Sequence, residues 1–204
     1  MLDQRYRATA SLPSNVVHVP AVKQRTDFSC GASAALSLLR FWRGPEYARV
    51  EESDLFGALQ TTPAAGTEPE PIAEYLRVAA GLETRYLHGD VTLMQLEQAV
   101  DAGQPPLVDL QCWRDTQAPW SEVWDAGHYA ILVGYDSEHL FFMDPSVLTE
   151  GPYAFMPRGE LNERWHDTTG SDDTRVERMV VFVRGARALW TPGDALPSVA
   201  TRLG

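Results

Sequence analysis

The sequence has few cysteines, little basic charge and no long apolar run, and each shortage excludes a class of protein. Two cysteines among 204 residues cannot build a disulfide framework. Lys and Arg total 17 against 28 Asp and Glu, so the net charge is −11 at pH 7, with no basic run to neutralise phosphates. We therefore expect no nucleic-acid partner and no binding to an anionic membrane surface. Because no apolar run reaches about 18 residues, we expect no membrane-spanning helix.

Motifs for metal binding and for secretion are missing as well. The five histidines have no metal-like spacing with cysteine or glutamate, and neither CxxC nor HExxH occurs. We therefore expect no metal and no other cofactor. Residues 1–15 are polar and lack the apolar stretch of a secretory signal. The prediction is a cytoplasmic protein with reduced thiols.

What the sequence does contain is a globular composition with helices first and strands mostly second. Hydrophobic residues make up 44% and charged residues 22%, near the globular averages. This order of elements predicts an α+β fold. Residues 1–15 are interpreted as a flexible N-terminal arm, 16–185 as a single domain and 186–204 as a C-terminal tail. Helices are predicted near 30–42, 50–60, 67–80, 92–102 and 158–165, and strands near 82–87, 107–113, 129–135, 140–143 and 178–184.

Cys30 stands where a polar loop gives way to a predicted helix. A thiol at a helix N-terminus lies near the positive end of the helix dipole, which favours the thiolate. Gly31 removes a side chain where a substrate needs a close approach. A small buried cysteine that begins a helix is the competing explanation. A catalytic thiol would also need a base and an oriented proton path.

His128 is the histidine best placed to be that base, because it opens the apolar run 129–135 at the rim of a predicted hairpin. Asp144 ends the second strand of the same hairpin. If residue 130 pairs with residue 144, His128 and Asp144 share a face as diagonal neighbours, roughly 7 Å apart along the backbones. Gln24, in the loop before Cys30, offers an amide N–H that would complete an oxyanion site with the Cys30 N–H. Each residue also has an ordinary structural explanation: a strand cap, an Asp-Pro turn or a solvated loop amide.

In this order, the motifs resemble the active-site segments of papain-like cysteine peptidases. Most similar are the bacterial double-glycine leader peptidases of the bacteriocin-processing type and their stand-alone relatives. The matching segments are QRTDFSCGASAAL (24–36), GHYAILVGYD (127–136) and FFMDPS (141–146). The resemblance implies N-terminal helices packed on a C-terminal antiparallel sheet. It also implies Cys30 as nucleophile, His128 as base, Asp144 as orienting group and Gln24 as oxyanion donor, with no cofactor.

Transporter-linked leader peptidases usually carry Asp directly before the cysteine, where this chain has Ser29, so the sequence looks more like the stand-alone branch. The interpretation is a thiol-dependent peptidase or amidase that forms an acyl-enzyme with a peptide or amide substrate. An acyltransferase on the same scaffold and a catalytically idle peptide- or partner-binding domain stay open as alternatives. A redox-sensing thiol would need a resolving cysteine, and Cys112 in an apolar strand is poorly placed for that role.

Further residues near the motifs are candidates for the substrate cleft. The loop 114–127 precedes His128 and is a candidate wall or lid. The polar cluster Arg164-Trp165-His166-Asp167 has no assigned role, and the sequence does not indicate an oligomeric state. The candidate cleft residues are Gly31, Gly127, Trp120, Trp124 and Tyr129.

Overall fold

The computed structural model describes residues 8–114, 117–193 and 196–204. Its helices are α1 (Cys30–Arg43), α2 (Glu52–Leu59), α3 (Pro69–Val78), α4 (Leu93–Asp101) and α5 (Leu161–Arg164), with short 3-10 turns η2 (Gly44–Tyr47), η3 (Trp120–Glu122) and η4 (Arg158–Glu160). Its strands are β1 (Thr9–Ser11), β2 (Glu83–Leu87), β3 (Leu107–Gln111), β4 (Gly127–Tyr135), β5 (His139–Met143), β6 (Tyr153–Pro157), β7 (His166–Thr169), β8 (Thr174–Glu177), β9 (Val180–Arg184) and β10 (Val199–Arg202).

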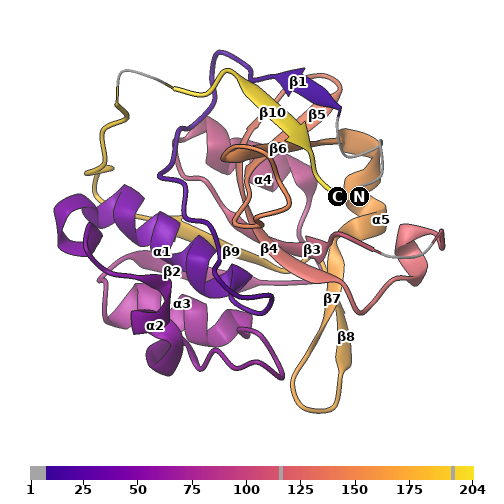
Figure 1. Cartoon of the computed structure of the whole chain (residues 1–204), viewed down its shortest axis with the longest axis horizontal. Helices are drawn as coiled ribbons and strands as arrows, with labels where there is room; N and C mark the ends of the chain where they lie inside the picture. Colours follow the sequence, from indigo (N-terminus) through magenta and orange to yellow (C-terminus); the bar gives the residue numbers. More distant parts are fainter. Residues whose placement is uncertain (1–7, 115–116, 194–195) are drawn as a thin grey trace.

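One eight-stranded sheet organises the chain, in the order β1-β10-β6-β5-β4-β3-β9-β2, and β7 and β8 form a separate hairpin. All pairings in the large sheet are antiparallel except that of β10 with β6. Figure 1 shows α1, α2 and α3 gathered on one side of the molecule and the β7–β8 hairpin projecting away from the sheet. The predicted α+β class is confirmed.

The central strands are buried on both faces, which explains why their sequences are almost continuously apolar. Successive side chains of a strand point to opposite faces. Ile131 and Val133 of β4 therefore join one core with α1, α2 and α3, while Ala130 and Leu132 join a second core with α4 and α5. Gly127 and His128 are the first two residues of β4 and lie at the border of these two cores.

Helix α1 is a buried helix rather than an amphipathic surface helix. Small residues such as Ala32, Ala34 and Ala35 are fully buried and let its backbone approach the sheet closely. The helix ends at Gly44, whose φ of 51° lies in the region that other residues avoid. The first residue of the helix, Cys30, lies near the N-terminal end of β4, where Cys30 and Gly127 line the same pocket.

At its open end, the hairpin of β4 and β5 has the register in which His128 and Asp144 share a face. Ile131 pairs with Met143 and Leu132 with Phe142, the register that places residue 130 opposite residue 144. A bulge between Leu132 and Gly134 shifts the pairing toward the turn. This irregularity lies away from His128 and leaves the predicted face of the site intact.

The two ends of the described chain differ from the prediction. Most of the expected arm, residues 1–7, lies outside the described residues, but Thr9–Ser11 forms β1. The expected tail contributes Val199–Arg202 as β10, which pairs with both β1 and β6. Backbone pairing at the sheet edge thus places both segments in the fold, and the limits 16–185 for a catalytic domain stay a prediction. No helix within the described ranges has the length and apolarity to cross a membrane.

Candidate active site

Cys30 is held at the first turn of α1 by a buried carboxylate from α2. Glu52 is 3% exposed and accepts hydrogen bonds from Ser29 Oγ (3.2 Å), the Arg25 backbone N–H (2.7 Å) and Ser33 Oγ. These bonds tie the loop before Cys30 to the helix that follows it. The backbone N–H groups of the first turn have no acceptor within the helix itself, and that of Gly31 interacts with the Cys30 thiol.

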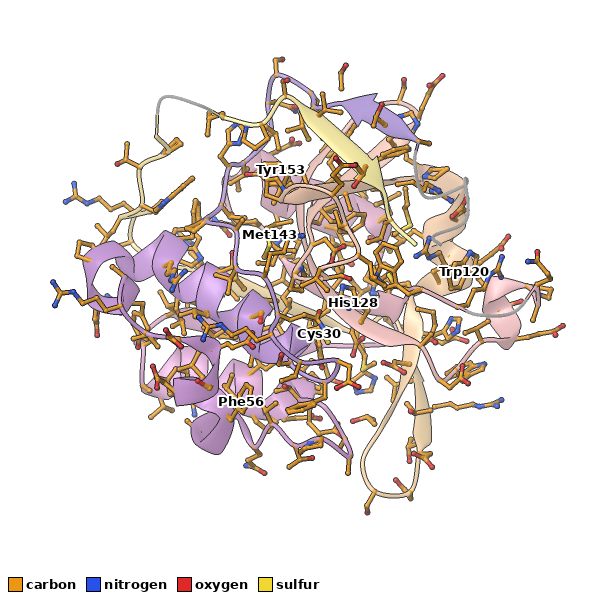
Figure 2. The ribbon with its side chains drawn as sticks, in the orientation of Figure 1. Cys30, Phe56, Trp120, His128, Met143 and Tyr153 are labelled. Carbon is orange, nitrogen blue, oxygen red and sulfur yellow. The ribbon has the colours of Figure 1, made fainter. Side chains whose placement is uncertain are left out.

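His128 lies in β4, Asp144 directly follows the neighbouring strand β5, and the two side chains contact each other directly. His128 Nε2 is 2.6 Å from Asp144 Oδ1, and both side chains are almost completely buried. The thiol of Cys30 also interacts with the His128 ring. Since Asp144 engages Nε2, Nδ1 is the nitrogen left for the thiol. Figure 2 shows Cys30 and His128 together where α1 meets the sheet.

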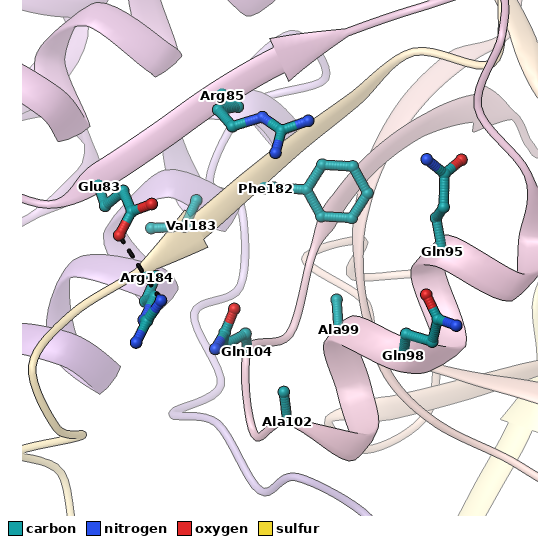
Figure 3. A pocket seen from close by; sticks show the side chains of 10 residues that line it. All are labelled: Glu83, Arg85, Gln95, Gln98, Ala99, Ala102, Gln104, Phe182, Val183 and Arg184. Atoms are coloured by element: carbon teal, nitrogen blue, oxygen red, sulfur yellow. Dashed lines mark ion pairs between the residues drawn. The ribbon is translucent and has the colours of Figure 1, made fainter.

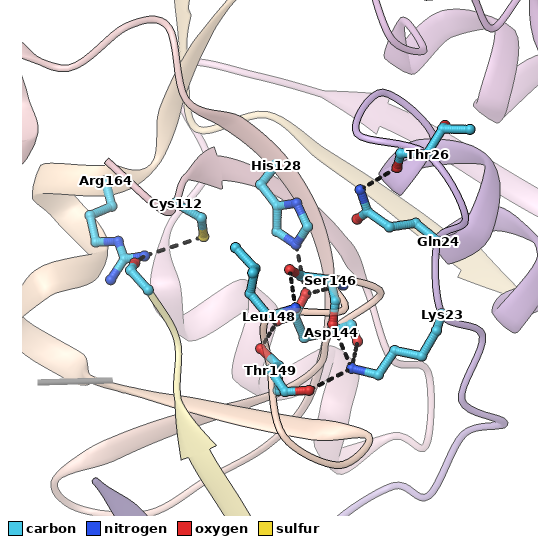
Figure 4. A network of polar contacts seen from close by, with 11 residues as sticks. Lys23, Gln24, Thr26, Cys112, His128, Asp144, Ser146, Leu148, Thr149 and Arg164 are labelled. Carbon is cyan, nitrogen blue, oxygen red and sulfur yellow. Dashed lines mark hydrogen bonds and ion pairs between the residues drawn. The ribbon is translucent and has the colours of Figure 1, made fainter. Parts of the chain in front are cut away.

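A ring of hydrogen bonds fixes the orientation of the Asp144 carboxylate. Oδ1 also accepts the Ser146 N–H at 2.9 Å, and Oδ2 accepts the Thr149 hydroxyl. Lys23 Nζ donates to the backbone carbonyls of Asp144 (3.0 Å), Ser146 (2.7 Å) and Thr149 (3.2 Å). Figure 4 shows this network beneath the His128 ring, so the aspartate is fixed by the loop that follows β5 as well as by β5 itself.

Electrostatics favour the charged form of all three groups. Burial opposes the Cys30 thiolate, but the hydrogen bond and charge of His128 outweigh burial and lower the pKa of Cys30. Burial favours a neutral His128, yet the Asp144 carboxylate raises the pKa of His128 well above its usual value. Burial also opposes the Asp144 carboxylate, and the charge of His128 with its hydrogen bonds lowers the pKa of Asp144. The arrangement therefore favours thiolate, imidazolium and carboxylate together.

Gln24 lies next to this group on the side of the polar loop. Its Nε2 donates to the Thr26 carbonyl at 2.8 Å, and its own backbone N–H donates to the Pro145 carbonyl at 2.8 Å. The side-chain Oε1 is buried without a hydrogen-bond donor among the described residues. Gln24 and His128 line the same pocket.

Two pockets meet at Gly127, the residue before His128. A cavity of about 550 Å³ opens toward the polar loop, and one of about 80 Å³ lies beside Cys30. A side chain at Gly127 would overlap Asp167 Oδ2, so only glycine keeps this point open. The larger pocket is lined by residues including Gln24, Cys112, Trp113, His128, Ser146 and Leu148. The smaller is lined by residues including Cys30, Thr67, Glu68, Asp109, Tyr129 and Asp167.

A third hollow, of about 330 Å³, lies between α4 and the strands β2 and β9 (Figure 3). None of its lining residues contacts Cys30, His128 or Asp144. Its walls carry Glu83 and Arg184, which face each other at 3.9 Å. It is separate from the site.

The predicted cleft residues divide into two groups. Tyr129 and Gly127 line the small pocket beside Cys30. Gly31 has a packing role, since a Cβ there would lie 2.8 Å from Thr67 Cβ. The structure does not bring the two tryptophans to these pockets. Trp120 packs against the guanidinium groups of Arg114 and Arg164, each 4.1 Å from its ring, and the Trp124 ring lies 4.2 Å from that of His166 and 4.6 Å from the guanidinium of Arg175.

Sequence reasoning missed Asp109 and Asp167, which lie beside Cys30. Asp109 is a carboxyl within the buried strand β3, and this unusual position was the available signal. Asp167 belongs to the polar cluster that had no assigned role, and β7 brings it next to β3. Arg164 of that cluster is fully buried elsewhere. Across the described part of the chain, no group of His, Cys, Asp and Glu is arranged to hold a metal ion.

The fold is that of a papain-like cysteine peptidase. The model of the Peptidase_C39-like family matches residues 16–172, and the chain belongs to this family. No curated protein sequence matches the chain.

Solved structures with the same fold are peptidases. A putative C39-like peptidase from Bacillus anthracis is 17% identical, covers 82% of this chain and 96% of that chain, and has a TM-score of 0.57. The peptidase domain of Streptococcus ComA, a bi-functional ABC transporter involved in a quorum-sensing pathway, is 18% identical with coverages of 82% and 99% and a TM-score of 0.55. A double-glycine-motif protease from an AMS/PCAT transporter, solved with the leader peptide, is 14% identical with coverages of 86% and 98% and a TM-score of 0.52. At these identities the likeness shows the fold, and family and fold together define a cysteine peptidase-like hydrolase.

Proposed function

We propose that the chain cleaves a peptide bond through an acyl-enzyme on Cys30. His128 is the acid–base group, Asp144 orients it, and Gln24 helps to hold the oxyanion. The observation that carries this proposal is the His128 ring, which interacts with the Cys30 thiol while its Nε2 lies 2.6 Å from Asp144 Oδ1.

In the first half-reaction, the Cys30 thiolate attacks the carbonyl carbon of the scissile bond. The electron pair of the C=O bond moves to the oxygen, which becomes the oxyanion. When the tetrahedral intermediate collapses, the C–N bond breaks and the imidazolium of His128 donates its proton to the leaving amine. The products are a free amine and a thioester on Cys30.

In the second half-reaction, His128 is neutral and accepts a proton from an attacking water. The water oxygen adds to the thioester carbonyl, and the C–S bond breaks to release a carboxylic acid and the Cys30 thiolate. Asp144 holds the ring in one orientation and stabilises its protonated form throughout.

Two donors are available for the oxyanion. The Cys30 backbone N–H lies in the first turn of α1, where no intrahelical acceptor exists. Gln24 Nε2 uses one N–H on the Thr26 carbonyl, which leaves the second for a ligand. Preorganised donors of this kind typically contribute about 10²–10³ in rate each.

A peptide is the proposed substrate. The solved double-glycine-motif protease of the same fold was captured with a leader peptide. Gly127 lines both the 550 Å³ pocket and the 80 Å³ pocket. The two pockets would hold the parts of the substrate peptide on the two sides of the scissile bond. An activated thiol is of no use to a domain that only binds a partner.

The first test is the pH dependence of Cys30 alkylation by iodoacetamide, followed by peptide mass spectrometry. Because the pKa of Cys30 is lowered, the rate should rise with a midpoint below the free-thiol value of about 8.5. In His128→Ala the burial remains while the hydrogen bond and positive charge are lost, so the midpoint should move upward.

The buried thiol of Cys112 serves as the internal control, because burial raises its pKa. Its alkylation should be slow in both proteins. The charge of His128 also lowers the pKa of Cys112, so His128→Ala should slow Cys112 further and should not make it reactive. A Cys30 that reacts like an ordinary thiol, with the same midpoint in both proteins, would contradict the proposed mechanism.

A further inference from the structure

The small pocket beside Cys30 is strongly acidic. The pocket has a volume of about 80 Å³ and is lined by the carboxyl groups of Asp109, Asp167 and Glu68. None of its described lining residues is Lys, Arg or His. Glu68 is satisfied by the Thr169 hydroxyl and the Gly170 N–H. The other two carboxyls interact with each other. His166 also acts on the charge of Asp167, but it is not among the residues that line the pocket.

Asp109 has one oxygen without a hydrogen-bond donor. The side chain is 5% exposed and its carboxyl interacts with the Tyr129 hydroxyl, but Oδ1 is buried with no hydrogen-bond donor among the described residues. By contrast, Asp167 Oδ1 accepts from Gln111 Nε2 (3.0 Å) and the Thr168 N–H (2.8 Å). Leaving a buried carboxylate oxygen without a donor is costly, so such atoms are usually paired with a ligand or hold a proton.

The buried carboxyl groups of Asp109 and Asp167 would be stabilised differently in the empty and in the occupied pocket. Burial, together with the charges of Asp167 and the Cys30 thiolate, raises the pKa of Asp109, and burial also raises the pKa of Asp167. With nothing bound, the two carboxyls are therefore expected to share a proton. A cation between them would replace that proton and supply the missing donors.

We propose that this pocket is a specificity site for a primary ammonium group of the peptide substrate, held by Asp109 and Asp167. The inference rests on the proposed function, because Cys30 lines the same pocket and would attack the carbonyl next to the bound group. Its size sets the ligand. A cavity of about 150 Å³ accommodates benzene, so one of about 80 Å³ holds an ammonium group with the one or two carbons next to it and excludes an aromatic ring or a bulky quaternary ammonium.

The test compares small thiol reagents that differ only in the group they deliver. The Cys30 thiolate attacks the sulfenyl sulfur of a methanethiosulfonate, methanesulfinate leaves, and the ethyl-linked group remains as a mixed disulfide. The matched reagents carry aminoethyl, trimethylammonioethyl and hydroxyethyl groups. The trimethylammonium reagent feels the same electrostatic field but has no N–H to donate and is too large for the pocket.

In the wild type, the aminoethyl reagent should modify Cys30 at least about tenfold faster than the trimethylammonioethyl reagent, the order expected for charge-assisted hydrogen bonds. In Asp109→Asn and Asp167→Asn this ratio should fall to the smaller value that the size of the trimethylammonium group alone produces. Because the ratio is taken within each protein, a general change in thiol reactivity cancels. The matched control is Asp90→Asn, an exposed carboxyl in a turn, which should keep the wild-type ratio.

The hydroxyethyl reagent separates this inference from the proposed function. If its rate shows a low-pKa thiol but the cation ratio is near one in the wild type, the ammonium site is wrong and the proposed function stands. If the thiol is ordinary but the ratio is large and depends on Asp109, the ammonium site stands and the proposed function is wrong.

Two pairs of peptide aldehydes then identify the source of the ammonium. One pair is glycyl-glycinal with a free or an acetylated amine, and the other is acetylglycyl-lysinal with its norleucine counterpart. The pair whose inhibition ratio collapses in Asp109→Asn names the source, either a peptide N-terminus or a lysine side chain. If neither pair distinguishes the two proteins, the site does not select substrates and the inference is overturned.

Discussion

His128 lies between two acidic groups, and its protonated ring stabilises the anionic form of both. Its protonated ring stabilises the Cys30 thiolate, and the Asp144 carboxylate stabilises the protonated ring. Removal of the Asp144 charge should therefore lower the pKa of His128, since burial is then opposed only by the smaller contributions of Cys30 and Cys112. The loss of imidazolium should in turn raise the pKa of Cys30.

The corresponding prediction is that Asp144→Asn reduces peptide turnover by roughly 10²–10⁴-fold, the usual contribution of an oriented acid–base group. It should also shift the alkylation midpoint of Cys30 to higher pH. The hairpin offers a matched control in Asp136, which lies 3.5 Å from His139 near the exposed turn. Asp136→Asn should leave both measurements unchanged, and an equal effect of the two variants would contradict the assigned role of Asp144.

At the residue scale, the sequence pointed to the catalytic candidates but not to the acidic residues of the small pocket. Cys30, His128 and Asp144 each stand at the end of an element with a strong apolar pattern, so their places could be predicted from local signals. Asp109 and Asp167 come together only through the packing of β7 against β3, and the polar sequence of β7 gives no strand signal. Packing between segments that are distant in sequence produces no periodic pattern in the sequence, so it could not be predicted from one.

At the scale of elements, the first turn of α1 depends on α2. Glu52 bonds the loop before Cys30 and the helix after it, so it fixes where the thiol and its backbone N–H point. The neighbouring Glu51 differs in environment: it is half exposed and pairs with Arg25 at 2.6 Å. The same substitution, Glu to Gln, can therefore be compared at a buried position and at an adjacent exposed position.

We expect Glu52→Gln to cost about 1–3 kcal/mol of unfolding free energy, because one amide cannot accept all the donors that surround the carboxylate. It should also lower the rate of Cys30 alkylation. Glu51→Gln should change stability by no more than about 1 kcal/mol. Urea denaturation monitored by tryptophan fluorescence measures both, and equal losses would show that Glu52 does not hold α1 in place.

The elements also show where sequence patterns stop being informative. The long apolar strand β4 and its partner β5 could be predicted from the sequence. Their register could not, because β4 is buried on both faces and shows no alternation that would select one pairing. β1 and β10 span only three and four residues with polar positions, TAS and VATR, and carry no such alternation. Their place in the sheet follows from backbone hydrogen bonds at an edge, which any sequence can make.

At the scale of the molecule, Arg164 links parts of the chain that are distant in sequence. It is fully buried, and it donates to the Gln111 carbonyl (2.9 Å) and to Cys112 Sγ (3.2 Å) on the side of β3. It also donates to the carbonyls of Leu203 (3.4 Å) and Gly204, which follow β10. Figure 4 shows it on the far side of Cys112 from His128, so this buried cation supports the wall of the larger pocket.

Arg164→Met should therefore destabilise the whole molecule and not one edge of it. Several buried carbonyls would lose their donor at once, and removal of a buried, hydrogen-bonded charge typically costs about 3–5 kcal/mol. The control is Arg184→Met, because Arg184 is 61% exposed and lies 3.9 Å from Glu83, an arrangement worth at most about 1 kcal/mol. Thermal unfolding should show one cooperative transition at a much lower Tm for Arg164→Met and a nearly unchanged Tm for Arg184→Met. A loss confined to fraying of residues 199–204, detected by hydrogen exchange while β3 stays protected, would instead mean that Arg164 only fastens the edge strand and does not support the pocket wall.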